Sequence, residues 1–323
     1  KGFGSEGDLD HTEEGGRLSM ADPSEVGARA VERGRDQLGT LGSGNHFMEI
    51  GVVDEIYDHA AAAAFGLRND GVTVFIHTGS RGLGYQVCDD ALDVMQRAVE
   101  KYHISLPDRQ LACAPVESPE GRRYLATMAC AANYAWANRQ VIMSLAKRAI
   151  AAALGRSEEA LGLRLLYDVC HNIAKLEEHE AEGRRAVLCV HRKGATRAFP
   201  PGSADVPGVY RSIGQPVLIP GDMGTHSYVC VGTEAAMEKT FGSTCHGAGR
   251  VLSRSRAKKE ARGRNLREEL AAAGVTVAAV GKHTLAEEMP FAYKNVADVV
   301  GVMDRAGIAR KVARLRPLGV VKG

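Results

Sequence analysis

Three short segments, each rich in apolar and β-branched residues and each ending in a histidine, constrain most strongly what this chain can fold into. They are Gly71–His77, Leu163–His171 and Ala186–His191. Residues of this kind favour strands, and side chains alternate between the two faces of a strand, so each histidine is expected at a strand end. Polar, basic or glycine-rich residues follow each one. Folds that mix helices and strands often place their chemistry at such strand ends, and we expect a functional site there.

Long helical stretches separate these strands. Apolar residues recur at three- and four-residue spacing over Ala91–Lys101 and Tyr124–Leu154, which predicts two scaffold helices without chemistry. A stretch with proline and glycine, Leu106–Gly121, divides them. Further expected elements are a strand–turn–strand unit over Gln215–Val231, a short strand over Val275–Val280 and a helix over Tyr293–Met303. The mixture favours an α+β fold.

The first 40 residues are polar and contain no sustained apolar period. A short helix is expected over Pro23–Arg33, with Asp22 as its N-cap. We expect this segment to wrap around a core that is built by later residues.

Composition places the chain among ordinary globular proteins. Its 323 residues are 45% hydrophobic and 25% charged, and they suffice for one large domain or two smaller ones. No apolar run approaches the ~20 residues of a membrane span. Seven cysteines without any CxxC pair are typical of a reducing compartment, so we expect a cytoplasmic protein. The sequence opens at Lys1 rather than at a methionine, and we expect it to be part of a longer polypeptide.

The net charge of +2 does not by itself indicate nucleic-acid binding. Its distribution is more informative, because Arg254–Arg267 contains seven basic residues and one acid, Glu260. Such a run forms either a solvated helix face or a contact with a phosphate backbone.

The stretch Phe241–Arg254 places one imidazole, His246, between small polar residues and a glycine-rich turn. Glycines allow backbone N–H groups to approach a phosphate closely. A histidine held beside phosphates can attack phosphorus and form a covalent phosphoramidate. The same residues would also fit an ordinary loop.

A second glycine-rich loop, within Gln37–Ile50, leads to Asn45, His46 and Glu49. Asn45 and Glu49 offer a hydrogen-bonding pair to a base or a ribose, and His46 offers a metal ligand between them. The alternative is a simple turn that feeds a strand.

Two basic positions remain open to either a functional or a structural interpretation. The segment Lys193–Arg197 is basic and flexible, which suits an anion or an ordinary charged loop. Lys322 is the penultimate residue and would be a frayed, solvated end unless the tail folds back into a cleft.

Neutral imidazoles bind Mn, Zn and Fe, and ligands that converge from separate strands form many catalytic metal sites. His46, His77 and His171 all lie at or beside expected strand ends. None has the spacing of a zinc finger or an HExxH motif, and each alone could be a structural histidine.

Eight sequence blocks together resemble the RtcB family of RNA-splicing ligases. In order they are GTLGSGNHFMEI, HTGSRGLG, DVCHNIAK, HRKGATRAFPPG, PGDMGTHSYV, TCHGAGR, AYKNV and PLGVVKG. They follow the order of the family from residue 37 to residue 323, so the resemblance covers nearly the whole chain.

The resemblance implies an enzyme that joins an RNA 3′-phosphate or 2′,3′-cyclic phosphate end to a 5′-hydroxyl end, using GTP and Mn²⁺, in tRNA splicing or RNA repair. It implies a single RtcB-like α+β domain over residues 1–323 with a deep active-site cleft. Two Mn²⁺ ions are expected in the complete protein. RNA ends are the expected partner, with archease as a further one and no membrane.

Site residues follow from matching positions. His246 resembles the histidine that becomes guanylylated, and His46, His77 and His171 resemble manganese ligands. The positions implied to contact the guanine nucleotide are Asn45, His46, Phe47, Met48, Glu49, His171, Asn172, Pro220, Gly221, Asp222, Met223, Ser227, His246, Gly247, Ala248, Gly249, Tyr293 and Lys322. Phosphate or RNA anchoring is implied for Arg33, Arg81, Lys193, Arg250 and Arg254.

One departure from the family pattern matters. The family has an upstream DVGCGM block whose Asp and Cys complete the two-metal site, and this sequence lacks it. Asp168 and Cys170 resemble part of the block, but alternation places them on the strand face opposite His171. We therefore expect an N-terminal segment to be missing. The alternatives are a metal-dependent phosphatase or nucleotidyltransferase that uses the same site, and a non-catalytic RNA- or nucleotide-binding remnant.

Overall fold

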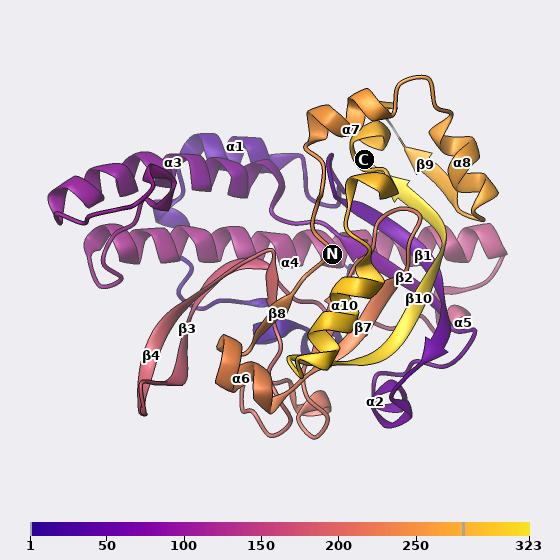
Figure 1. Cartoon of the computed structure of the whole chain (residues 1–323), viewed down its shortest axis with the longest axis horizontal. Coiled ribbons are helices and arrows are strands. Elements are labelled where there is room, and N and C mark those ends of the chain that lie inside the picture. The colour runs from indigo at the N-terminus through magenta and orange to yellow at the C-terminus, as the bar shows by residue number, and fades with distance from the viewer. Residues whose placement is uncertain (1, 280–281) are drawn as a thin grey trace.

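The largest sheet is a curled, six-stranded sheet at one side of the molecule (Figure 1). The computed structural model describes residues 2–279 and 282–323. The strand order is β2-β1-β10-β7-β6, with β9 beside β10, and two small sheets pair β3 with β4 and β5 with β8. The strands are β1 Phe47–Ile56, β2 Val72–His77, β3 Asn172–Ala181, β4 Arg184–Lys193, β5 Ala195–Arg197, β6 Pro216–Ile219, β7 Ser227–Gly232, β8 Ser243–Cys245, β9 Thr276–Ala279 and β10 Ala309–Lys322.

Helices flank the sheet, and the longest of them, α4, runs along the long axis of the molecule (Figure 1). The α-helices are α1 Ala28–Arg35, α2 His59–Ala64, α3 Arg81–Lys101, α4 Pro119–Leu154, α5 Glu158–Leu161, α6 Glu234–Thr240, α7 Arg254–Glu260, α8 Leu266–Ala272, α9 Lys282–Glu287 and α10 Val296–Arg305. Ser118 caps α4 by accepting from the Gly121 N–H, and Gly155 ends it in the left-handed conformation. The mixture of helices and strands confirms the predicted α+β class.

The C-terminal tail is a central strand of the main sheet. β10 pairs antiparallel with β1 and β7 and parallel with β9. Pro317 cannot donate a ladder hydrogen bond, and the β1–β10 register shifts opposite it, between Ile50 and Gly51. The tail is therefore folded inward, and the frayed-end alternative for Lys322 is wrong.

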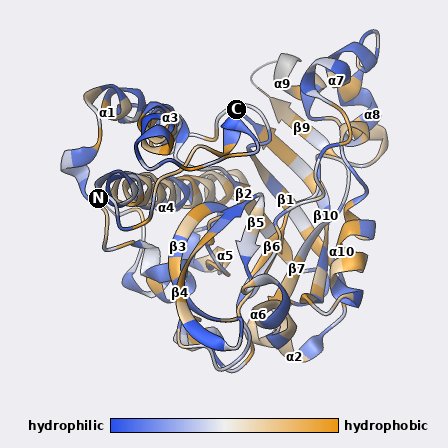
Figure 2. Ribbon diagram, turned by 60° about the vertical axis from the view of Figure 1, so that its left-hand side comes forward, coloured by the Kyte–Doolittle hydropathy of each residue, from blue (hydrophilic) through white to orange (hydrophobic). Residues whose placement is uncertain are grey.

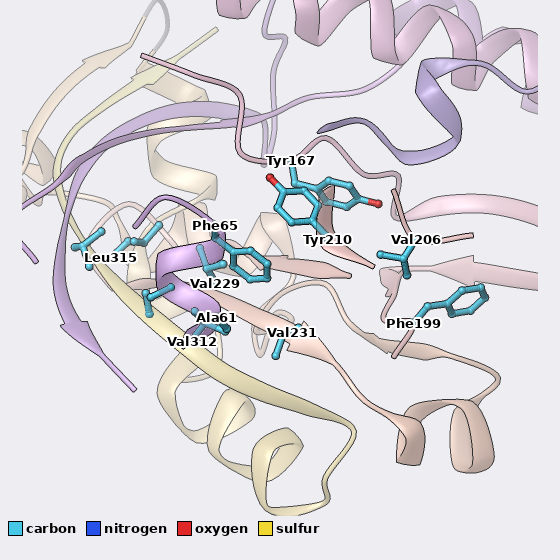
Figure 3. Close-up of a cluster of buried hydrophobic side chains, with 13 residues drawn as sticks. Ala61, Phe65, Tyr167, Phe199, Val206, Tyr210, Val229, Val231, Val312 and Leu315 are labelled. Carbon is cyan, nitrogen blue, oxygen red and sulfur yellow. The ribbon is translucent and has the colours of Figure 1, made fainter. Parts of the chain in front are cut away.

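The inner face of the curled sheet supplies the largest hydrophobic cluster (Figure 3). Val53, Val229 and Leu315 from three neighbouring strands are each at most 2% exposed. Phe65 from the end of α2 and the tyrosines Tyr167 and Tyr210 cover them. Hydrophobic residues lie along β1 and β10 (Figure 2), and β7 is buried along its whole length because Tyr228 and Cys230 pack in a second cluster with α10.

The polar N-terminal segment packs along α4, as predicted. Leu18 lies in a cluster with Trp136 and Ile173. The Asn133 side chain accepts a hydrogen bond from the Leu18 N–H and donates one to the Leu18 carbonyl oxygen. Asp22 caps a short 3₁₀ turn, Pro23–Glu25, by accepting from the Ser24 N–H. The expected helix over Pro23–Arg33 is therefore divided into this turn and α1.

The predicted strand over Leu163–His171 is wrong. The segment contains only one isolated bridge, between Asp168 and Thr12, and the strand β3 begins after it at Asn172. Asp168 accepts a hydrogen bond of 2.6 Å from Arg139 of α4, and Leu166 and Val169 pack on the main cluster. The segment is thus held by this bridge, through backbone hydrogen bonds of Asp168 with His11 and Glu13, and by side chains, and no strand pairs along its length.

Several boundaries also differ from the prediction. α3 begins at Arg81, ten residues before the predicted start, so Gly82 and Gly84 of TGSRGLG belong to a helix rather than a turn, and Gly79 precedes it. A Cβ on Gly82 would lie 3.0 Å from the Arg33 carbonyl oxygen, which explains the glycine. The basic stretch forms two helices, α7 and α8, separated near Gly263 at a φ of +77°.

The remaining elements agree more closely with the prediction. The strand–turn–strand unit is β6–β7, and the predicted strand Ala186–His191 lies within β4. β9 matches Val275–Val280 except that Val280 lies outside the described residues. α10 starts at Val296, capped by Asn295, rather than at Tyr293. Among the described residues, none of the helices combines the length and the apolarity needed to cross a bilayer.

Candidate metal and nucleotide site

Three imidazoles from separate parts of the chain meet at one point. His77 ends β2, His171 precedes β3 and His246 follows β8. The Nε2 atom of His77 lies 3.4 Å from Nε2 of His171 and 3.2 Å from Nε2 of His246. The His171 and His246 rings are stacked, with centroids 3.6 Å apart and planes 8° from parallel. The three donor atoms form a group that could hold a metal ion.

The backbone of Gly194 holds two of these histidines together. Its N–H donates to the His171 carbonyl oxygen at 3.0 Å and to the Asn172 side chain at 3.1 Å. Its carbonyl oxygen accepts from the His246 N–H at 3.3 Å. The two-stranded sheets β3–β4 and β5–β8 thus fix the positions of His171 and His246 relative to each other.

Burial keeps these imidazoles neutral. It lowers the pKa of His171 to about 2, and it lowers the pKa values of His77 and His246 well below the usual 6.5. Lys193 lies close enough to lower the pKa values of His171 and His246 further. Neutral imidazole is the form that binds a metal or attacks an electrophile.

A cavity of about 480 Å³ opens beside the cluster. The three histidines line one part of it, and β2, the middle of α4 and residues 162–169 line the rest. A cavity therefore adjoins the three histidines, and its other walls are largely apolar.

His46 lies beside the three-histidine group rather than within it. Its ring meets the His77 ring edge-on, with centroids 5.9 Å apart. Burial lowers its pKa to about 4, with smaller contributions from Arg81, Lys322 and Arg254. These cations therefore surround this side of the site, and Arg81 also donates to Thr40 at 3.1 Å in the glycine-rich loop.

Glu49 lies on β1 and is only 1% exposed. One carboxylate oxygen accepts from the Ser227 hydroxyl at 3.0 Å, and the other is buried without a partner in the described part of the chain. Ser227 also accepts from the Gly221 N–H at 3.1 Å, which joins β1 to the Pro220–Met223 turn. Burial raises the pKa of Glu49 to about 7, opposed by Ser227 and assisted by Asp222.

A second polar group lies around the end of β10. Lys322 is 1% exposed, and burial lowers its pKa to about 8. Near it, Arg250 donates to Glu288 at 3.0 Å and to the Tyr293 hydroxyl at 3.1 Å, while Tyr293 itself donates to Glu288. This arrangement holds Tyr293 beside the glycine-rich loop after His246, because the Lys294 N–H donates to the Gly249 carbonyl oxygen at 2.9 Å.

Most of the other predicted residues fall on the same few segments. Phe47 and Met223 are buried in one cluster, and Asn45, Met48 and Asp222 adjoin them in sequence. Gly247 and Ala248 continue from His246, and Arg254 forms an ion pair with Glu288 at 3.6 Å. Arg33 differs from this pattern, because it donates to Gln86 at 2.9 Å and stacks over Tyr85 on α3.

Sequence reasoning missed two supporting residues. Arg139 lies in a helix to which no chemistry was assigned, yet it donates to Asp168 and to the Thr78 carbonyl oxygen, beside His77 and His171. An arginine at a position that helical periodicity expects to be apolar was the available signal. Glu288 is 2% exposed and binds Arg250, but nothing in its local sequence distinguishes it from a surface acid.

Comparison with known proteins identifies the family. A family model described as tRNA-splicing ligase RtcB matches residues 1–323. Relatives named tRNA-splicing ligase RtcB include those of Archaeoglobus fulgidus, 59% identical, Pyrococcus abyssi, 55% identical, and Thermococcus kodakarensis, 53% identical. Each match covers the whole of this chain, but only 67%, 35% and 67% of those relatives, respectively. The chain therefore belongs to the RtcB family.

Proposed function

We propose that this chain forms the catalytic part of an RNA ligase that joins 3′-phosphate or 2′,3′-cyclic phosphate ends to 5′-hydroxyl ends, in tRNA splicing or RNA repair. The observation that supports this most is the stacking of His246 on His171 next to His77. It places a neutral imidazole against a pair of potential metal ligands and close to several cations. Family membership supports RNA ligation in tRNA splicing, and the geometry offers a candidate nucleophile.

The donor atoms fit a divalent transition metal. Two nitrogens that share a tetrahedral ion at ~2.0–2.1 Å lie roughly 3.4 Å apart, and the Nε2 atoms of His77 and His171 lie 3.4 Å apart. His77 and His171, with His46 beside them, would hold Mn²⁺, and a second ion is proposed for the complete protein. Bound metal would neutralise phosphate charge and polarise phosphorus.

The guanine nucleotide would occupy the region between β1, the Pro220–Met223 turn and the end of β10. The unpartnered Glu49 oxygen can accept from the N1–H and amino donors of guanine. Tyr293 and Lys322 would close the other side, and backbone N–H groups of Gly247–Gly249 would face the phosphates. Asn45, Asn172, Lys193, Arg81, Arg250 and Arg254 supply further polar contacts at the rim.

In the first step, the lone pair of His246 forms a bond to the α-phosphorus of GTP, and the bond to the leaving pyrophosphate breaks. An imidazole attacks without first losing a proton, because its neutral form already has the lone pair. The guanylyl group then passes to an oxygen of the RNA 3′-phosphate, which frees His246. A 2′,3′-cyclic phosphate end enters this step after water has attacked its phosphorus and the bond to O2′ has broken, which leaves a 3′-phosphate and a 2′-hydroxyl. Attack by the RNA 5′-hydroxyl oxygen displaces GMP and forms the new phosphodiester. Archease is proposed as a helper of this cycle.

The test is covalent labelling of the full-length protein with GTP in the presence of Mn²⁺. Label in the α-phosphate should remain on the wild-type protein as an acid-labile, alkali-stable adduct, whereas label in the γ-phosphate should not. His246→Ala should abolish the adduct, and peptide mass spectrometry should locate GMP on His246.

His226→Ala is the matched control. His226 lies in the turn between β6 and β7. Its side chain is 37% exposed and lies 3.4 Å from the Asp54 carboxylate. This variant should keep the adduct. A GMP group found on a lysine would refute the assignment of His246, and a protein that ligates RNA without any adduct would refute the pathway.

A further inference from the structure

The basic stretch after the nucleotide site divides into paired and unpaired cations. Arg256 pairs with Glu260 at 3.1 Å, Arg264 pairs with Glu269 at 2.6 Å, and Lys258 pairs with Glu287 of α9. Among the described residues, Lys259, Arg262 and Arg267 are exposed and have no carboxylate within ion-pair distance, and Arg267 donates instead to the Ala279 carbonyl oxygen at 3.1 Å. Lys259 and Arg262, three residues apart in the sequence, are therefore left as uncompensated charges.

The helical geometry of α7 shows where these charges point. Ala257 and Ala261 are buried, at 0% and 7% exposure, and mark the inward face. At ~100° per residue, Lys259 projects almost opposite Ala257, and Arg262 is exposed in the turn that follows α7. In Figure 2, α7 is largely hydrophilic. The two cations thus form an outward, solvated surface.

This surface is continuous with the proposed active site. α7 begins at Arg254, whose guanidinium lowers the pKa of His46 and would lie 3.3 Å from a Cβ placed on Gly44. Over α7, from Arg254 to Glu260, the chain advances by roughly 9 Å along the helix axis, at ~1.5 Å per residue. A nucleic-acid strand has one phosphate per ~3.4 Å, so this length spans about two to three nucleotides.

We propose that Lys259 on the outward face of α7 and Arg262 in the turn after it bind the phosphate backbone of the substrate RNA a few nucleotides away from the reacting end. The proposal rests on the proposed RNA-ligase function, and it adds an RNA-positioning surface that touches neither GTP nor the metal. Uncompensated cations that lead away from a site for RNA ends match the charge of the strand that such a site must hold.

The experiment measures binding of a fluorescent single-stranded RNA with a 3′-phosphate to the full-length protein, by anisotropy at several salt concentrations. Lys259→Gln with Arg262→Gln should weaken binding about 10- to 25-fold near 0.1 M salt. It should also reduce the slope of log affinity against log salt by about 1.4, because each single-strand phosphate contact contributes ~0.7.

Arg184→Gln with Arg185→Gln is the matched control. These exposed arginines begin β4, at the opposite end of the strand from Lys193. Their replacement changes the net charge by the same amount as the Lys259/Arg262 double variant does. The control should leave the affinity and the slope unchanged. Equal losses in both double variants, or no loss in either, would overturn the proposal.

Two further readouts separate this proposal from the proposed function. Guanylylation with GTP and Mn²⁺ in the absence of RNA should proceed at the wild-type rate in the Lys259/Arg262 variant. A lower rate would show that these residues do not act through RNA. The difference between wild type and variant should vanish for a dinucleotide 3′-phosphate, which is too short to reach Lys259 and Arg262, and its persistence would also overturn the proposal. If the wild type forms no adduct, the proposed function fails while the binding comparison still decides the role of α7.

Discussion

Glu49 makes the stability of the nucleotide-free protein depend on pH in a direction opposite to that of most carboxylates. Replacing it with glutamine keeps an oxygen for the Ser227 hydroxyl but removes the ionisable group. In the wild type, burial raises the pKa of this carboxyl from 4.5 to about 7. Between these two values the folded protein binds a proton at Glu49 that the unfolded chain does not, so the free energy of unfolding falls as the pH rises.

The size of the effect follows from the difference in pKa. A difference of 7 minus 4.5, at ~1.36 kcal/mol per pKa unit, amounts to about 3 kcal/mol. The stability is therefore fully present below pH 4.5 and is lost as the pH rises through about 7. Glu49→Gln should remove this loss, so the variant should be more stable than the wild type at pH 8 by about 2–3 kcal/mol and nearly equal to it at pH 4.5.

Urea denaturation of both proteins at pH values between 4.5 and 8.5, without nucleotide, measures this difference. Equal stability at every pH, or a wild type that is more stable at pH 8, would refute the burial argument. Guanine supplies two donors to the carboxylate, so GTP binding below pH 7 should release a proton in the wild type only. Calorimetry in two buffers with different ionisation enthalpies detects that proton, and the variant should bind GTP more weakly by ~1–3 kcal/mol while keeping its affinity for Mn²⁺.

Two other perturbations follow from the buried charges. Lys322→Met should reduce guanylylation by about 10- to 150-fold, which corresponds to the ~1.5–3 kcal/mol of a hydrogen bond to a charged group. Circular dichroism should show that β10 is intact, and normal labelling would show that Lys322 is structural only. Arg192 makes bonds of 2.7 and 2.8 Å to Glu177, both nearly fully buried, so Arg192→Met alone should cost ~3–5 kcal/mol, whereas Arg192→Met with Glu177→Met should be close to neutral. Denaturant titration of Arg192→Met, Glu177→Met and the double variant measures these free energies of unfolding. Additive losses in the double variant would contradict the prediction.

Local sequence patterns predicted the elements whose residues have a distinctive composition or period. The β-branched run that ends at His77 forms β2, and the long apolar periodicity after Tyr124 lies within α4. The histidines could be selected because each follows an apolar run and precedes a polar one. Their convergence could not be derived in this way, because it depends on Gly194, which joins two segments that are more than 70 residues apart.

Two failures have different physical causes. In β10 the register shifts opposite Ile50–Gly51 and again near Lys311, so the apolar residues Val312, Leu315 and Val320 do not follow a strict period of two. A central strand therefore resembled a basic tail. Around Leu163–His171 the period of two is regular, but a strand requires a partner, and the local sequence contains no information on which edge is available.

The ring geometry bears on which of the three histidines acts as the nucleophile. The Nε2 lone pair of a neutral imidazole lies in the plane of its ring and can bind either a metal or phosphorus, but not both at once. The planes of His171 and His246 are 8° from parallel and their centroids lie 3.6 Å apart, so a single ion in the plane of one ring lies far from the plane of the other. His77 is inclined at 62° to both rings and can share an ion with either. One ion can therefore be held by His77 together with either His171 or His246. The roles that we propose, with a metal on His77 and His171 and the His246 lone pair free for the nucleotide, are one of the two arrangements that this geometry allows.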